Sequence, residues 1–449
     1  MQKNHLTLSF VTLLLFVGCQ KDAPLGDDDN TDPITSDLFL PQIKITTNGE
    51  IVDEPKVSGN IQLIENGAIL EEYTIGIEYR GSSSQSFDKK SYGFETWDSN
   101  LEDLDVPLAG FPEEEDWILN GPYSDKSLMR NVLIYDLSNA IGRYTSRTKF
   151  YELTINDDFL GTYVLMEKLK RDKNRIAIEK NEDGDISGGY VIKIDKPTGD
   201  GEWYNESFSF PSQFNPQGGI GGASIHFLYD YPDPDEITVD QKSYIQNYMN
   251  DFETVLLSEN FSDPTDGYQK YVDIDSFVDF FLLNEITKNV DGFRLSTYMH
   301  KDKGSKLKMG PIWDFNLAFG NADYCGGGET SGWGHRINDI CGGDGPWQVP
   351  FWWGRLMEDP IFVTSLKARW QFLRSGNFST PSIMGRIQEI ESNLIEKDAI
   401  NRNFIEWPIL GQYIWPNNFV GATYTEESNY LKTWVVDRMS WLDNAIEEL

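Results

Sequence analysis

Apolar and polar residues alternate with a period of two along much of the first part of the chain, a pattern typical of β-strands with one buried face. In residues 74–81, TIGIEYRG, the alternation ends at a glycine. Two further alternating segments flank the turn sequence NDDF at residues 156–159, which predicts a β-hairpin. The predicted strands cover residues 42–47, 60–66, 74–80, 91–96, 149–155, 160–169 and 188–195.

Helical periodicity occurs once within this strand-rich part and dominates the chain beyond Pro197. Apolar residues of segment 125–142 follow helical spacing, and the segment stops at Gly142. Thr238 and Gln241 form a capping box, which predicts the start of another helix. Further helices are predicted at residues 273–289, 362–373, 381–398 and 426–448. A strand-rich first part and a helical second part predict an α+β fold with two lobes.

Residues 290–316, VDGFRLSTYMHKDKGSKLKMGPIWDFN, follow a predicted buried helix and have the pattern of a single β-hairpin. The turn sequence DKGS lies near its middle. Asp291 and Asp314 are placed symmetrically about Asp302 and Lys303, so the hairpin would bring the two carboxylates together at its open end. This pairing is the main candidate for chemistry in the chain.

Composition and charge exclude several classes of function. The chain has 39% hydrophobic and 13% aromatic residues, enough for a large core, but its net charge of -34 argues against binding nucleic acid. The sequence contains four histidines and neither G-x-S-x-G nor H-E-x-x-H, which disfavours a Ser-His-Asp hydrolase and a histidine-based metalloenzyme.

The N-terminal residues have the features of a secretory leader. Lys3 and His5 precede an apolar run at residues 6–17, and the run ends at Cys19 in FVGC. This ending resembles a bacterial lipobox, although Phe16 stands where leucine is preferred and an ordinary signal peptide is the alternative. We predict a lipoprotein signal peptide at residues 1–18, lipidation of Cys19 and a disordered acidic tether at 19–37.

The acidic tether also resembles the export signals of surface lipoproteins of the Bacteroidetes type. The expected location is therefore the outer membrane of a bacterial cell envelope, with export to the cell surface. Because the chain is strongly acidic, contact with the membrane is expected through the lipid alone.

Two cysteines remain after the leader, and they enclose a glycine-rich segment. Cys325 and Cys341 are separated by fifteen residues. In a secreted chain this pair predicts a disulfide, which would contribute about 3 kcal/mol through loop closure. The alternative is a zinc site, for which His335 would be a third ligand and a fourth is missing.

The order of the predicted elements resembles that of a protein kinase. Strand, turn, strand, lysine-bearing strand, helix and hairpin are followed by a helical region, with aspartates on either side of a short hairpin. Five blocks also resemble, in order, those of the CotH family of spore-coat-protein-H-like atypical kinases: YRGSSSQSFDKKSYGFE, DKSLMRNVLIYDL, NDDFLGTYVLMEKL, NVDG and GPIWDFNLAFG. The resemblance covers residues 38–449 and implies an N-lobe at about 38–170 and a C-lobe at about 171–449.

The CotH resemblance implies a divergent two-lobed kinase-like fold that uses ATP with Mg²⁺ or Mn²⁺ and transfers phosphate to hydroxyl groups of an unidentified protein substrate. Asp291 would be the catalytic aspartate and Asp314 a metal ligand. Each also has a plainer interpretation, since Asp291 could end the preceding helix and Asp314 could be a buried carboxylate held by backbone donors.

Three further residues are candidates for binding nucleotide. Lys90 shares a predicted strand face with apolar neighbours and is therefore favoured over Lys89 as the inward-pointing cation, although it could be an ordinary solvated lysine. Arg80 ends its strand and could bind phosphate or pair with an acid. Glu167 lies where a hinge between lobes would start, or is an ordinary carboxylate at a strand end.

The sequence departs from the kinase pattern at one site position. Ser296 stands five residues after Asp291, where an ordinary kinase has a metal-binding asparagine, and Asn316 or Asn289 could replace it. The predicted helix at 125–142 also offers no glutamate to pair with a lysine. The rival hypothesis is an inactive surface adhesion protein, in which several of the thirteen tryptophans would bind glycans.

Overall fold

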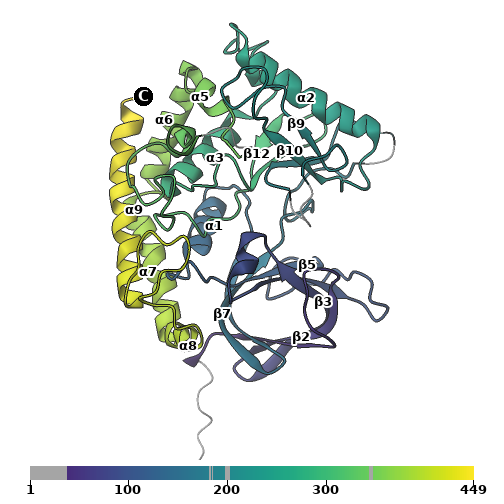
Figure 1. Cartoon of the computed structure of the whole chain (residues 1–449), viewed down its shortest axis with the longest axis vertical. Helices are drawn as coiled ribbons and strands as arrows, with labels where there is room; N and C mark the ends of the chain where they lie inside the picture. Colours follow the sequence, from purple (N-terminus) through teal and green to yellow (C-terminus); the bar gives the residue numbers. More distant parts are fainter. Residues whose placement is uncertain (1–37, 182–183, 185, 198–202, 343–346) are drawn as a thin grey trace, which may run out of the picture.

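The computed structural model describes residues 38–181, 184, 186–197, 203–342 and 347–449. Within these residues the fold is α+β, with a strand-rich N-terminal region and a helical C-terminal region (Figure 1). The predicted signal peptide, Cys19 and the predicted tether lie outside the described residues. Among the helices of the described ranges, none combines the length and the apolar character needed to span a membrane.

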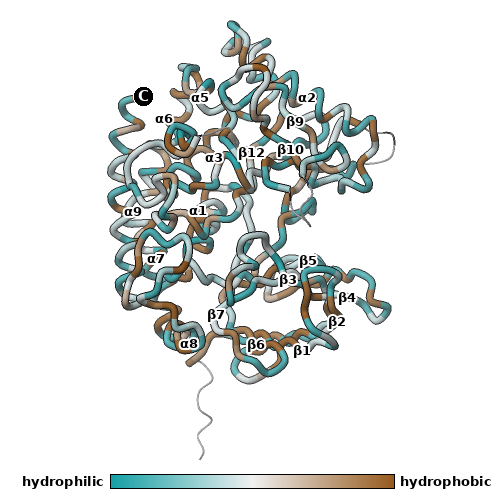
Figure 2. The backbone as a smooth tube through the Cα atoms, in the orientation of Figure 1, coloured by the Kyte–Doolittle hydropathy of each residue, from teal (hydrophilic) through white to brown (hydrophobic). Residues whose placement is uncertain are grey.

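Seven strands of the N-terminal region form a closed barrel in the order β1-β2-β3-β4-β5-β7-β6. Neighbouring strands are antiparallel except β1 and β6, whose parallel pairing closes the barrel. Apolar residues recur along these strands (Figure 2), and their inward-facing members fill the barrel. The strands are β1 Gln42–Thr47, β2 Val57–Glu65, β3 Ala68–Arg80, β4 Ser91–Trp97, β5 Asp116–Asn120, β6 Thr148–Ile155 and β7 Asp158–Glu167.

Three strands of the structure were not predicted: β5 in the barrel, and β9 Ser209–Pro211 and β10 His226–Tyr231 in the second sheet. Four of the five residues of β5, sequence DWILN, are buried, so the segment shows no alternation of polar and apolar positions. Strand β10 follows a glycine-rich loop that predicts only irregular structure. Strand β9 is only three residues long, so no alternating pattern marks it either.

The second sheet has five strands in the order β12-β11-β8-β10-β9. It contains the predicted hairpin, but only in part, because Met299 pairs with Met309 and the paired strands are short. Left-handed backbone at Ser296 (φ 47°) and Gly310 (φ 102°) ends the ladder on both sides. The prediction of one hairpin across 290–316 is therefore wrong in extent. The strands are β8 Tyr190–Ile194, β9 Ser209–Pro211, β10 His226–Tyr231, β11 Thr297–Lys301 and β12 Leu307–Met309.

Helix α3 is the central helix of the C-terminal region, and α6 and α9 pack against it. Helix α8 packs against β7 and so joins the end of the chain to the barrel (Figure 1). The capping box at Thr238 is confirmed at the start of α2. The helices are α1 Arg130–Ala140, α2 Val239–Leu257, α3 Ile274–Thr287, α4 Asn338–Cys341, α5 Trp352–Leu356, α6 Pro360–Arg374, α7 Thr380–Glu396, α8 Ala399–Glu406 and α9 Tyr424–Glu447.

Candidate active site

A cavity of about 410 Å³, here called the cleft, lies between the barrel and the helical region. The loop after β3 forms one wall, and α1 with the ends of β5 and β7 forms another. The third wall comes from the segments that follow β8, α3 and β12, and the last of these covers residues 313–317. Its polar lining includes Arg80, Ser82, Asp125, Lys193, Asp195, Lys196, Asp291, Ser296, Asp314 and Asn316, and its apolar lining includes Ile118, Val132, Val164, Met166 and Leu317.

Asn289, directly after α3, ties the two predicted aspartates together. Its Oδ1 accepts a hydrogen bond from the backbone N–H of Asp291 at 3.2 Å, and its Nδ2 donates to the carbonyl of Asp314 at 3.1 Å. Asn289 is buried, so these bonds are shielded from water. The side chain that was considered as a metal ligand therefore sets the positions of Asp291 and Asp314.

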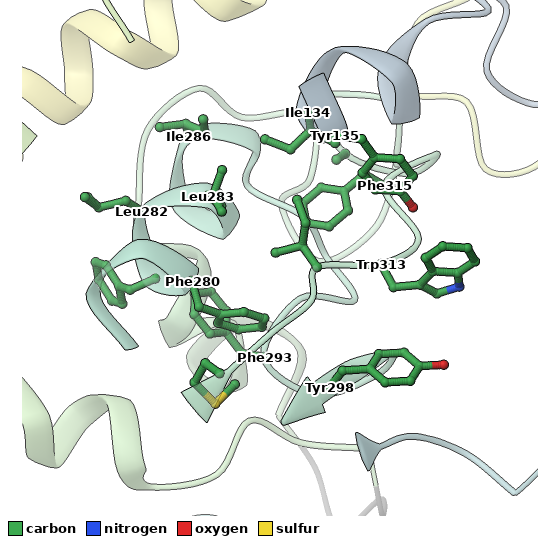
Figure 3. Packing of buried hydrophobic residues seen from close by; sticks show 14 of the residues in the cluster. Ile134, Tyr135, Phe280, Leu282, Leu283, Ile286, Phe293, Tyr298, Trp313 and Phe315 are labelled. Atoms are coloured by element: carbon green, nitrogen blue, oxygen red, sulfur yellow. The ribbon is translucent and has the colours of Figure 1, made fainter. Parts of the chain in front are cut away.

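Helix α1 holds the Asp314 segment from the other side. The backbone N–H of Asp314 donates to the Tyr135 hydroxyl at 3.0 Å, and that of Phe315 donates to Asn131 Oδ1 at 2.8 Å. Figure 3 shows Tyr135 beside Phe315, with Trp313 pointing away from α3 toward the side of Tyr298. These contacts hold Asp314 in a left-handed conformation, φ 62°, which is uncommon outside glycine and concentrates at functional sites.

Asp195 is a third cleft carboxylate, which the sequence analysis missed as a site residue. Strand β8 pairs with β11 so that Ile194 lies opposite Thr297, and this register places Asp195 beside Ser296. The Ser296 hydroxyl donates to Asp195 Oδ2 at 3.3 Å. One signal was available, because Asp195 directly follows a buried apolar strand.

The pKa values of the three cleft aspartates all lie above the ordinary value. For Asp314, desolvation and then the charges of Asp291 and Asp195 raise the pKa to about 6, while Arg80 lowers it. Burial raises the pKa of Asp291 and of Asp195 as well. Asp314 faces the open cleft although protein surrounds it on its other sides, and no hydrogen bond from the described residues reaches its carboxylate. Its charge is therefore available to a ligand.

Arg294 Nη2 lies 3.5 Å from Asp291 Oδ1, and the cation that acts most on Asp314 is Arg80 at the end of β3. Its guanidinium lies 5.3 Å from the ring centroid of Trp313, and its charge lowers the pKa of Asp314. Lys193 and Lys196 also line the cleft, and Lys193 Nζ lies 2.8 Å from Asp230 Oδ1. Arg80, and not Lys90, therefore faces the cleft from the barrel.

Lys90 does not point toward the two aspartates, so the predicted orientation is wrong. Its Nζ donates to the carbonyls of Gln85 and Phe87, 2.7 and 2.6 Å away, and thereby stabilises the loop after β3. Lys89 is buried instead, and its Nζ binds Thr162 O and Asn403 Oδ1. The strand β4 begins only at Ser91, so strand alternation does not govern either lysine.

Glu167 ends β7 as expected but does not line the cleft. Its carboxylate is buried and accepts hydrogen bonds from Arg147, with Nε 2.9 Å away and the backbone N 3.0 Å away. The Ser146 hydroxyl binds its carbonyl at 2.9 Å. Glu167 is thus fully used in joining β7 to the turn before β6, and the cleft-facing residue beside it is Met166.

The plainer interpretations of the two aspartates do not fit the structure. Helix α3 ends at Thr287 with Lys288 as its C-cap, so Asp291 does not terminate it. Asp314 accepts no backbone hydrogen bond from the described residues. Of the tryptophans considered for glycan binding, Trp352 and Trp353 are buried, at 0% and 1% exposed, whereas Trp347 and Trp415 are 42% and 50% exposed.

The predicted disulfide between Cys325 and Cys341 is confirmed, with the two Cα atoms 5.2 Å apart. It lies close to the cleft, because the neighbouring Tyr324 hydroxyl donates to Asp291 Oδ1 at 3.4 Å. Trp415, which lines the cleft, stacks on Tyr324 with ring centroids 6.3 Å apart. The glycine-rich loop therefore supports the side of Asp291.

Another acidic group lies outside the cleft. In the described part of the chain, carboxylate oxygens of Asp105, Glu114 and Glu115 lie within 4.8 Å of one another. Lys170 Nζ already approaches Glu114 and Glu115 at 2.7 and 2.6 Å. This group is an ion-pair network of the barrel, and the cleft carboxylates are less tightly grouped than it is.

A family model described as CotH kinase protein matches residues 77–442, which is most of the chain and includes all three cleft aspartates. The chain belongs to the CotH family. It is also 25% identical over 246 residues to the inner spore coat protein H of Bacillus subtilis (strain 168). That match covers 55% of this chain and 59% of the relative, so the chain spans about three-fifths of the length of that CotH protein.

Proposed function

We propose that this CotH-family protein has a divergent kinase-like fold and transfers the γ-phosphate of ATP to serine or threonine hydroxyls of a protein substrate. The observation that carries the proposal is the convergence of Asp195, Asp291 and Asp314 in one cleft between the barrel and the helical region. Membership of the CotH kinase family supports the same reaction class.

Asp291 is the proposed catalytic aspartate. It is placed by Asn289 and Tyr324, and burial keeps its pKa above the ordinary value, which favours uptake of a proton from a bound hydroxyl. Arg80 would bind the phosphates from the barrel side of the cleft. Phosphoryl transfer depends on such fixed charges and on position more than on covalent chemistry by the protein.

A divalent cation fits the donors present in the cleft. Asp314 has a carboxylate without a described hydrogen-bond donor, and Asn316 and Asp195 add oxygens of the kind that Mg²⁺ and Mn²⁺ prefer. We therefore assign Asp314, Asp195 and Asn316 as the residues that would hold the metal. When bound, the cation would neutralise phosphate charge and relieve the repulsion among the carboxylates.

The purified full chain should incorporate label from γ-³²P-ATP into itself or into a generic acceptor protein such as casein, with Mg²⁺ or Mn²⁺ present. Asp291→Ala and Asp314→Ala should each lower the rate about a hundredfold or more. Asp437→Ala, on the exposed face of α9, is the matched control and should leave the rate unchanged. Equal labelling in all four proteins would overturn the proposal.

We also propose that Cys19 is lipidated and that the protein is held at the bacterial outer membrane, facing the cell surface. The leader sequence and the acidic segment after it support this location. The alternative function, adhesion without catalysis, predicts neither nucleotide binding nor an effect of the Asp291 substitution, and so the labelling experiment separates the two.

A further inference from the structure

A second cavity, of about 310 Å³, lies behind the segment that carries Asp314. Consecutive residues of this segment line the two cavities, with 310–312 in the second cavity and 313–314 in the cleft, and the two cavities share no lining residue. The remaining walls come from the end of α1, residues 175–177, α3 and the β11–β12 hairpin. Neither the proposed reaction nor the family assignment gives this cavity a role.

The charged groups of the second cavity are all basic. Arg143, Arg175, Lys308 and His300 line it, and none of its described lining residues is an aspartate or glutamate. This is unusual in a chain with 72 acidic and 38 basic residues. Chance placement of ionisable residues would favour acids here, so the lining marks a local site for negative charge.

Part of this positive charge has no counter-charge nearby. Arg143 Nε lies 2.7 Å from Asp279 Oδ2, but Arg369 Nε lies 2.7 Å from the other oxygen of the same carboxylate, so two guanidinium groups share one negative charge. Lys308 Nζ makes no ion pair or hydrogen bond with the described residues. Arg175, by contrast, is buried and balanced by Glu114 at 3.1 Å. The excess charge therefore comes from Lys308 and the Arg143 pair.

His300 adds an imidazole ring whose protonation depends on the charges of Lys308 and Arg143. Its Nδ1 is 2.9 Å from Gly310 O, and because a carbonyl accepts, Nδ1 carries the hydrogen. Its Nε2 makes no hydrogen bond with the described residues. Desolvation lowers the pKa of His300, and the charges of Lys308 and Arg143 lower it further. These three groups are thus close enough to act on one ligand.

The floor of the second cavity is apolar. Phe280 and Leu283 of α3, which are labelled in Figure 3, contribute to it together with Met309 and Ile312. Arg143 and Lys308 are half-buried, whereas the four floor residues are buried. A ligand would therefore contact positively charged groups near the solvent and an apolar surface deeper in the cavity.

We propose that this cavity binds a small amphipathic anion, a phosphate monoester or carboxylate carried on an apolar body. Lys308, Arg143 and His300 hold the anionic group. Phe280, Leu283 and Met309 contact the apolar body. This site is separate from the cleft, and binding there does not depend on whether the chain transfers phosphate.

Calorimetric titration of the full chain with phenyl phosphate and with benzoate tests the proposal, with benzyl alcohol as the uncharged control. Both anions should bind more tightly than benzyl alcohol, and Lys308→Glu should weaken their binding about tenfold or more. Lys306→Glu makes the same charge change on an exposed residue of the same hairpin, outside the cavity, and should change the affinity less than about twofold.

Two further measurements locate the bound anion. Arg80→Ala removes the cleft cation proposed to bind phosphate and should leave the affinity for phenyl phosphate unchanged. In NMR titrations, the anion should raise the pKa of His300 and leave that of His226 unchanged. The proposal is overturned if the uncharged probe binds as well as the anions, if both glutamate variants weaken binding equally, or if Arg80→Ala abolishes it.

Discussion

Ser296 donates a hydrogen bond from Oγ to Oδ2 of Asp195 across 3.3 Å, and this contact joins the end of β8 to the segment that follows α3. Ser296 stands five residues after Asp291, the proposed catalytic aspartate, and an ordinary kinase has a metal-binding asparagine at that spacing. The serine side chain is shorter, and the oxygen that it reaches belongs to a carboxylate on the neighbouring strand. The pairing of two strands that are distant in the sequence thereby brings into the cleft a carboxylate oxygen, which the segment around Ser296 lacks.

If Asp195 supplies that metal-binding oxygen, Asp195→Asn should raise the Mn²⁺ concentration needed for half-maximal labelling about tenfold, because an amide oxygen carries no charge. The measurement is the initial rate of phosphate transfer against metal concentration. Asp437→Asn should behave as the unchanged chain. An Asp195→Asn protein with the same metal dependence as the unchanged chain would exclude Asp195 as a ligand.

Asp314→Asn should make the metal-free protein more stable at pH 7, by roughly 1 kcal/mol after allowance for solvent screening. The folded-state pKa of Asp314, about 6, lies above its ordinary value of 3.8, so ionisation costs more in the folded state. This cost grows as the pH rises from about 4 to 6 and is complete above 6. The gain should therefore vanish below pH 4.

Thermal unfolding of the two proteins between pH 4 and pH 8 checks this difference. Addition of Mg²⁺ at pH 7 should stabilise the unchanged chain more than Asp314→Asn, because the cation offsets the repulsion among carboxylates. An Asp314→Asn protein that is less stable at every pH would show that the carboxylate is held by favourable contacts.

Arg80 and Lys90, at the two ends of the loop after β3, should differ in their effects. Arg80→Met should lower the rate of phosphate transfer about tenfold to a hundredfold, since it removes the charge beside Asp314. Lys90→Met should lower the rate less than about threefold, and its main effect should be a loss of stability of about 1 kcal/mol from the two loop carbonyls. Kinetics and thermal unfolding of both variants distinguish the roles, and the reverse ranking of rates would restore Lys90 as the catalytic cation.

Loss of the disulfide should affect both stability and catalysis. The double variant Cys325→Ser, Cys341→Ser should unfold with about 3 kcal/mol less free energy, as expected for a loop of this length. Loss of the disulfide should also loosen the contact of Tyr324 with Asp291. The rate of phosphate transfer by the double variant should therefore fall to the rate of a Tyr324→Phe variant. Denaturant unfolding and labelling assays measure the two effects, and a faster rate in the disulfide variant would contradict the link.

Cys19→Ser should release the protein from membranes in a bacterial host. Stable anchoring requires more than one acyl chain, and a lipidated cysteine would carry them. Incorporation of labelled palmitate and membrane fractionation are the readouts, with Cys325→Ser, Cys341→Ser as a control that keeps Cys19. Continued membrane retention of Cys19→Ser would favour a different mode of attachment.

Local patterns predicted most elements of this fold. The barrel strands with one buried face alternate, the long helices keep their period and caps, and the cysteine pair encloses a short loop, so each could be recognised within a short window. Strand β5 could not, because it is buried on both faces. Asp291 and Asp314 were found because a nearby turn brings their segments together, even though the hairpin itself is shorter than predicted.

The sequence by itself determined the α+β class, the position of the two main aspartates and the disulfide, since all of these depend on residues close along the chain. Only the tertiary structure decided which groups surround the aspartates. Asp195 reaches the cleft through the pairing of β8 with β11, Arg80 through closure of the barrel, and Lys90 turns away to satisfy two carbonyls of its own loop. Such long-range pairings and competing hydrogen bonds depend on distant segments, and no local pattern encodes them.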